Sequence, residues 1–128
     1  MTIESTFISN PVKTIIVNQT ASTSAAGVGD NNVAGGACYL ISATINNSNY
    51  GTVVYTKIAN LASYVAETNA ADYVLRCPAN GTKTYVFHPP VYFENGLSFA
   101  TTRTAGQGGT AAPTTPPAVT LILSTSAT

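Results

Sequence analysis

The side chains that most often carry out chemistry in proteins are few in this chain and stand far apart. His88 is the single histidine, so one chain cannot build a metal site from several histidines. No G-x-S-x-G motif marks an activated serine. The five carboxylates show no paired spacing that would indicate acid–base catalysis: Glu4, Asp30, Glu67, Asp72 and Glu94. We therefore expect a protein that is not an enzyme, with no catalytic residue, metal ion or cofactor.

Two glycine-rich segments are similar to phosphate-binding loops but lack the residues that such loops need. Gly27-Val28-Gly29 continues without a third glycine, and the segment 106–109 is followed by Thr110 without a lysine. Both segments are predicted to be flexible loops. His88, which precedes two prolines, is predicted to be a packing or turn residue.

The two cysteines, Cys38 and Cys77, are too far apart in the sequence to form a C-x-x-C site. Free cysteines are among the residue types most often buried. The sequence therefore favours a buried pair of free thiols. The alternative is a single disulfide between adjacent strands, which requires a close approach of the two Cα atoms.

Charged residues are scarce. Five basic and five acidic residues make up 8 % of the chain and give a net charge of zero, whereas roughly a quarter of the residues in a typical soluble domain are charged. The basic residues are scattered, which argues against binding to nucleic acid. A chain with so little charge to keep its copies apart is expected to associate with its own kind.

Membrane insertion and secretion are not expected either. No stretch approaches the run of about eighteen apolar residues that a membrane helix needs. The segment Met1–Glu4 is not a basic region followed by an apolar run, which a signal peptide would show.

Apolar and polar residues alternate with period two along most of the chain, and no window keeps a helical spacing over several turns. This pattern predicts an all-β fold. The expected strands are 12–17, 38–45, 52–58, 73–77, 83–87, 91–93, 97–102 and 118–124. The longest expected loops are 25–37, 60–71 (with at most one short helix) and 103–117.

Within the strand 38–45, strict alternation puts Tyr39, Ile41, Ala43 and Ile45 on one face of the sheet. The opposite face is half-apolar, so this strand is expected to be central in its sheet. At 118–124, alternation puts Val119, Leu121 and Leu123 together.

Two turn sequences predict hairpins. The turn 46–49 would join the strands 38–45 and 52–58, and the turn 78–81, Pro-Ala-Asn-Gly, would join the strands 73–77 and 83–87. The run His88-Pro89-Pro90 is expected to break the hydrogen-bond ladder, because proline has no N–H to donate.

These elements predict an N-terminal arm, residues 1–11, and one domain, residues 12–128. The domain is expected to be an antiparallel β-sandwich of seven to eight strands with jelly-roll or Greek-key connections.

Three segments carry a resemblance to a known family: Val53–Lys57, Asp72–Gly81 and Phe93–Thr102. Their turn sequences and the residue patterns of their strands resemble those of small β-sandwich virion proteins of tailed bacteriophages, including cyanophages and prophages. The likeness spans roughly residues 33–124.

The resemblance implies a capsid decoration (cement) protein with no active site to transfer. It implies a homotrimer or another symmetric cluster seated on the major capsid protein, in a virion that is assembled in the host cytoplasm. Two alternatives stay open. One is a tail, fibre or baseplate component, and the other is a carbohydrate-binding module that uses exposed tyrosines such as Tyr50, Tyr64 or Tyr92.

The residues expected to contact partners lie in the arm and the long loops, because backbone groups there are not committed to strand ladders. They are Thr2, Ile3, Phe7, Ile8, Pro11, Val28, Asn31, Arg103, Pro113 and Pro116.

Overall fold

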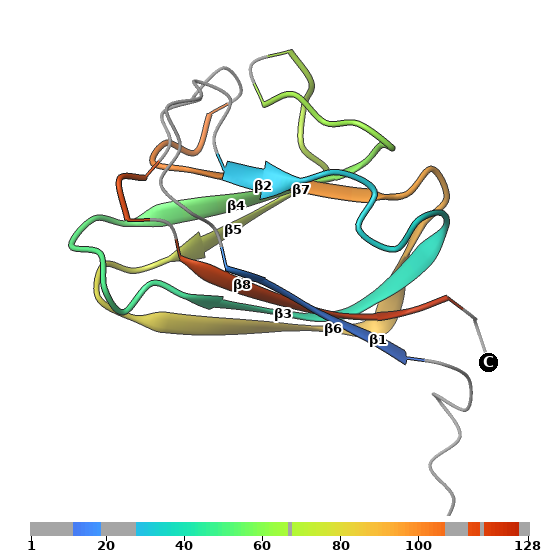
Figure 1. Cartoon of the computed structure of the whole chain (residues 1–128), viewed down its shortest axis with the longest axis horizontal. Helices are drawn as coiled ribbons and strands as arrows, with labels where there is room; N and C mark the ends of the chain where they lie inside the picture. Colours follow the sequence, from blue (N-terminus) through green and yellow to red (C-terminus); the bar gives the residue numbers. More distant parts are fainter. Residues whose placement is uncertain (1–11, 19–27, 67, 107–112, 116, 126–128) are drawn as a thin grey trace, which may run out of the picture.

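The computed structural model is a two-layered β-sandwich (Figure 1). It describes residues 12–18, 28–66, 68–106, 113–115 and 117–125. Its strands are β1 (Val12–Asn18), β2 (Val28–Asp30), β3 (Cys38–Asn46), β4 (Val54–Asn60), β5 (Tyr73–Cys77), β6 (Thr82–Phe93), β7 (Leu97–Thr102) and β8 (Ala118–Ser124). One sheet has the order β1-β8-β3-β6 and the other β2-β7-β4-β5, and all observed pairings are antiparallel.

The strand order is that of a jelly roll. The strands pair first with last and so inward along the chain: β1 with β8, β2 with β7, β3 with β6 and β4 with β5. The chain can thus be described as one long hairpin of four strand pairs. The pairs β1–β8 and β3–β6 belong to one sheet, and the pairs β2–β7 and β4–β5 belong to the other. At its free end Val12 of β1 pairs with Ser124 of β8. The predicted antiparallel β-sandwich is confirmed, and of the two kinds of connection that the sequence left open, the strand order matches the jelly roll.

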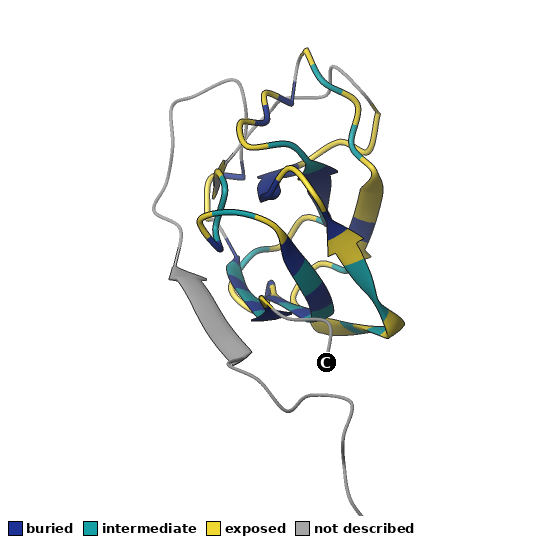
Figure 2. Cartoon of the chain, turned by 90° about the vertical axis from the view of Figure 1, so that its right-hand side faces the viewer, coloured by how far each residue is buried: buried dark blue, intermediate teal, exposed yellow. Residues whose placement is uncertain are grey.

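The main core lies between the two sheets and is formed by alternate apolar side chains of both inner faces. Figure 2 marks the buried positions along the ribbon. On β8, Val119, Leu121 and Leu123 are fully buried, as the alternation predicts. Phe93 of β6 and Phe99 of β7 supply the largest aromatic side chains of this core.

The alternation predicted for 38–45 is wrong in its second half. The ladders of β3 with β6 and β8 shift register between Leu40 and Ser42, which is the mark of a β-bulge. The extra residue reverses the in–out phase, so Cys38 and Leu40 are buried together with Ala43 and Ile45. The central position of the strand is confirmed, because β3 lies between β8 and β6.

Both predicted hairpins are wrong, because the strands on either side of each turn lie in different sheets. β3 and β6 belong to one sheet, and β4 and β5 to the other. The turns do reverse the chain, and Asn80 has the left-handed φ of 54° that the sequence Asn-Gly favours. They act as corners between the two layers.

One buried side chain joins the two corners. Asn47 is 1 % exposed, and its Nδ2 donates to the carbonyl oxygens of Thr52 at 2.9 Å and Pro78 at 3.1 Å. Its backbone N–H donates to the carbonyl oxygen of Gly81 at 2.7 Å. The two turns are therefore fixed against each other at one end of the sandwich.

One further segment differs from expectation, and another agrees in part. The predicted loop 25–37 contains the short strand β2. The predicted break of the ladder at His88-Pro89-Pro90 is confirmed, because the ladder with β3 is interrupted between Val86 and Val91, but the strand β6 itself continues through this run. The His88–Pro89 peptide is cis, and His88 is exposed rather than a packing residue.

Cys38 and Cys77 are both buried thiols outside any disulfide, as the favoured interpretation of the sequence predicts. The Cys77 thiol donates to the carbonyl oxygen of Ile45 at 3.3 Å, and burial raises the pKa of this thiol. The described part of the chain contains no helix with the length and apolar character needed to cross a membrane.

Candidate functional site

On the outward side of the β1-β8-β3-β6 sheet, the described residues that register places in rows on β8, β3 and β6 carry no charge. Register places outward residues of β6, β3 and β8 in rows, such as Thr84, Thr44 and Thr120, followed by Val86, Ser42 and Ile122. We call this surface the open face. Its described residues are Tyr39, Ser42, Thr44, Thr84, Val86, Tyr92, Thr120 and Ile122, none of which is acidic or basic.

Two side chains of the open face are largely apolar and well exposed. Val86 is 72 % exposed and Tyr92 is 51 % exposed. The Tyr92 ring packs against Tyr39 with a centroid distance of 4.8 Å, and the hydroxyls of Thr44 and Thr84 share a hydrogen bond of 3.0 Å. Such a surface can be buried against another uncharged surface without desolvating a charge.

The outward side of the other sheet is covered by loops over β4 and β7 (Figure 1), whereas Val74 of β5 is 45 % exposed. We call it the covered face and define it by Lys57, Ala59, Ser98, Ala100 and Thr102, all of which are buried. Ala59 and Ala100 form a second apolar cluster with residues of the loop between β4 and β5: Tyr64 and Ala66, with Leu61 and Ala71 at its margin. Loops therefore form a third layer over this sheet.

Hydrogen bonds fix these loops in place. The Ser98 hydroxyl donates to the carbonyl oxygen of Leu61 at 2.6 Å and accepts from the backbone N–H of Asn32 at 2.9 Å. The side-chain oxygen of Asn31 accepts from the backbone N–H of Tyr64 at 3.0 Å. The segment after β2 and the strand β7 are thus both tied to the loop that follows β4.

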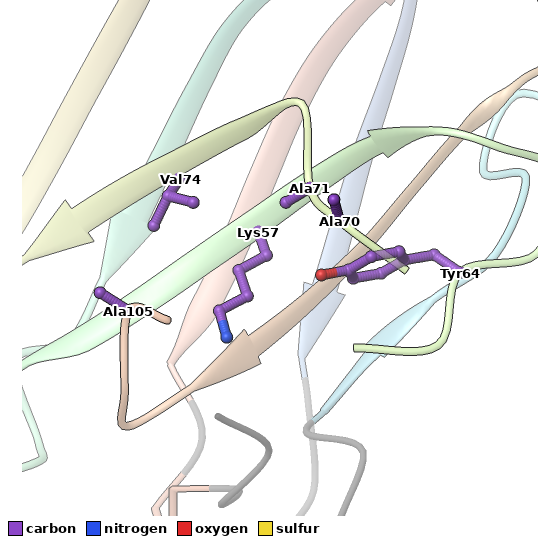
Figure 3. Close-up of a pocket in the computed structure, with 6 residues that line it drawn as sticks. All are labelled: Lys57, Tyr64, Ala70, Ala71, Val74 and Ala105. Carbon is purple, nitrogen blue, oxygen red and sulfur yellow. The ribbon is translucent and has the colours of Figure 1, made fainter. Parts of the chain in front are cut away.

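Lys57 lies at the centre of the covered face, in the middle of β4. It pairs with Val74 on one side and Ala100 on the other, and it is 1 % exposed. Its side chain runs over the sheet beside a hollow of about 220 Å³ (Figure 3). The hollow is lined by Lys57, Tyr64, Ala70, Ala71, Val74 and Ala105.

The chemistry of this hollow favours a structural lysine. Burial lowers the pKa of the Lys57 amine and raises that of the Tyr64 phenol. A lysine with a lowered pKa could act as a nucleophile. However, Nζ donates to the carbonyl oxygen of Gly106 at 2.8 Å, and neither a carboxylate nor a histidine is among the described lining residues. Lys57 therefore fastens the segment after β7 to the sheet.

No metal centre is found in the described ranges. They contain no group of three or more histidine, cysteine, aspartate or glutamate side chains that could hold an ion.

The residues predicted to contact partners do not converge on one described surface. Thr2, Ile3, Phe7, Ile8, Pro11 and Pro116 lie outside the described residues, so the arm stays a prediction. Val28 begins β2 and pairs with Thr101. Asn31 and Arg103 are exposed, whereas Pro113 is buried and has little surface to offer.

The tyrosines named for sugar stacking divide in a similar way. Tyr64 is buried at 7 % exposure, and the half-buried Tyr50 packs against the main core, so neither is an exposed platform. Tyr92 is exposed as predicted. The open face was not predicted, although every second residue on one side of three expected strands is small and uncharged or apolar.

Comparisons of the chain with protein-family models, with curated proteins and with solved structures find no match.

Proposed function

We propose that this chain is a non-enzymatic structural subunit of a bacteriophage virion, a capsid decoration protein that forms homotrimers and binds the major capsid protein. The observation that carries the proposal is the open face, whose described residues, as defined above, include no acidic or basic side chain. Its localisation would be the virion, assembled in the host cytoplasm.

The energetics of the open face support association. Threonine, serine and valine lose little side-chain entropy when they are ordered, and no charge has to leave water. Exposed Val86 would contribute apolar contact area. An exposed, uncharged sheet face is thus better suited to contact between subunits than to isolation in solvent.

The jelly-roll order adds support by analogy. Jelly rolls are common in viral capsid proteins, although lectins and other proteins share the architecture. A decoration protein that binds only the assembled shell would stabilise it by mass action, because shell opening would require its release.

The self-association is tested with two matched variants. Val86→Lys puts a charge on the open face, and Val65→Lys puts the same charge on a loop valine that is 37 % exposed on the covered side. We expect the wild type and Val65→Lys to be trimers by light scattering after size exclusion, and Val86→Lys to be monomeric. A wild type that stays monomeric at high concentration, or a trimeric Val86→Lys, would contradict the proposal.

Imaging of the phage particles that carry this chain tests its position. Density that repeats over the icosahedral lattice is expected for a decoration protein. Density found only at the tail vertex would contradict the decoration role and support the alternative of a tail, fibre or baseplate component. Absence of the chain from mature particles would refute both roles.

A further inference from the structure

A second surface feature lies at the side of the sandwich where β5 and β6 form the edges of their sheets. A cleft of about 290 Å³ opens there, near the small end of the range of roughly 300–1,000 Å³ for ligand pockets. It is lined by Asn60, Asp72, Tyr73, Val91, Tyr92 and Phe93. These residues come from three strands and from the loop that precedes β5.

The two polar side chains of the cleft, Asp72 and Asn60, each accept a hydrogen bond from a backbone N–H and can form further hydrogen bonds. Oδ2 of Asp72 accepts from the backbone N–H of Asn60 at 2.7 Å. Oδ1 of Asn60 accepts from the backbone N–H of Asn95 at 2.8 Å. In the described part of the chain, no further partner is found for the other carboxylate oxygen of Asp72 or for the NH₂ group of Asn60. One acceptor and one donor are therefore preorganised beside each other.

The two tyrosines of the cleft are held from behind by other rings. Tyr73 packs against Phe87 and Phe93 with centroid distances of 5.8 and 6.4 Å, and Tyr92 packs against Tyr39. They are nevertheless 37 % and 51 % exposed. No partner for either hydroxyl is found among the described residues. Each ring thus offers rigid apolar area with a polar tip.

We infer that this cleft binds a neutral hexopyranose unit of a saccharide. A pyranose has an apolar C–H face that would pack against a tyrosine ring, and adjacent hydroxyls that would donate to Asp72 and accept from Asn60. The Asp72 carboxylate disfavours an anionic sugar by charge repulsion. Asp72 is also the single carboxylate among the lining residues, so the cleft lacks the carboxylate pair of a glycoside hydrolase and would bind without cleaving.

This inference goes beyond the proposed structural role and does not depend on it. One small open cleft should bind a monosaccharide weakly, with a Kd of about 1 mM. A trimer would present three clefts and gain avidity on a repeating polysaccharide. Such binding would attach the assembled protein to a glycan-coated surface.

The test is saturation-transfer and chemical-shift NMR on the full chain with methyl glycosides of glucose, galactose and mannose as probes, and with methyl glucuronide as the anionic comparison. At least one neutral glycoside is expected to bind, and the glucuronide is expected to bind more weakly. Asp72→Asn and Tyr92→Ala should each weaken binding by about tenfold, while Tyr92→Phe should retain most of it because the ring remains.

Val86→Ala is the matched control, because this residue lies on β6 but does not line the cleft. It should bind like the wild type. Val86→Lys separates the two proposals, since it should abolish trimers while leaving binding of the monosaccharide intact. Failure of all three neutral glycosides to bind, stronger binding of the glucuronide, or unchanged binding by a correctly folded Asp72→Asn or Tyr92→Ala would overturn the inference.

Discussion

The two outer faces of this sandwich differ in what covers them and in where the charge lies. Loops fixed by Ser98 and Asn31 bury the covered face, and a lysine lies under them. The described residues of the open face have no such cover and no acidic or basic side chain. A buried charge is thus tolerated on the covered face, where the chain itself supplies a hydrogen bond to it.

The largest contrast should come from adding the same charge to each face. Ala100→Lys places an ammonium group in the second apolar cluster, directly beside Lys57 in register. We expect it to lower the free energy of unfolding by about 4 kcal/mol. Val86→Lys, at a residue 72 % exposed, should change it by less than about 0.5 kcal/mol.

Urea unfolding is measured at a protein concentration low enough for the wild type to be monomeric, because a trimer would add its association free energy to the apparent stability. If Ala100→Lys and Val86→Lys lost the same free energy of unfolding, the claim that only the covered face is buried by loops would be contradicted.

Removing a single hydroxyl should give a smaller contrast. Ser98→Ala deletes the bonds to Leu61 and Asn32 and leaves both backbone groups without this partner. The expected cost is about 2 kcal/mol. Ser42→Ala on the open face should cost less than about 0.5 kcal/mol. Amide hydrogen exchange should also rise in the loop 61–72 of Ser98→Ala, and an unchanged loop would contradict the assigned role of Ser98.

The buried lysine predicts a dependence of stability on pH. Because burial lowers the pKa of Lys57 below its ordinary value of 10.5 in the folded state, the unfolded chain binds more protons between the two values. The contribution of Lys57 to stability should therefore improve as the pH rises from the lowered pKa toward 10.5. Below the lowered pKa the full cost of burying the charge remains.

Lys57→Met isolates this contribution, since it keeps much of the side-chain volume and removes the titrating group. The difference in unfolding free energy between wild type and variant should change in favour of the wild type over that alkaline range. Comparing the two proteins cancels Tyr64, whose raised pKa acts in the opposite direction above its ordinary value of 10.0. A difference that stays constant with pH would contradict burial of the charge.

The smallest expected effect concerns salt. If the open face mediates trimer formation without charges, the dissociation constant should change by less than about threefold between about 0.05 and about 0.5 M sodium chloride. Sedimentation analysis at several concentrations measures it. If salt strongly weakened trimer formation, the contact between subunits would involve charged residues outside the open face, and the prediction would be wrong.

Alternation within strands made much of the fold predictable. The segment Ala118–Ser124 was expected as a strand and is one, with Val119, Leu121 and Leu123 in the core. Period-two patterning reports the local face directly, because successive side chains point to opposite sides of a strand. It reports nothing about an inserted residue, so the bulge after Leu40 reversed the predicted faces of Ala43 and Ile45.

Turn chemistry predicted chain reversals but not strand partners. Asn80 has the expected left-handed conformation, yet β5 and β6 belong to different sheets. Partner choice depends on how the long hairpin wraps, which is set by contacts between residues far apart in the sequence. The same applies to Lys57 and Tyr64, whose burial depends on loops that pack over the sheet and not on neighbours in the sequence.

The pairing of Val12 with Ser124 has a practical consequence. The first and last strands run side by side, so the entry and exit points of the domain are neighbours (Figure 1). A passenger peptide fused ahead of the domain or behind it would be displayed from nearly the same spot. A short linker joining these points would also permit circular permutation, with new ends opened at the exposed residues Ala79 and Asn80.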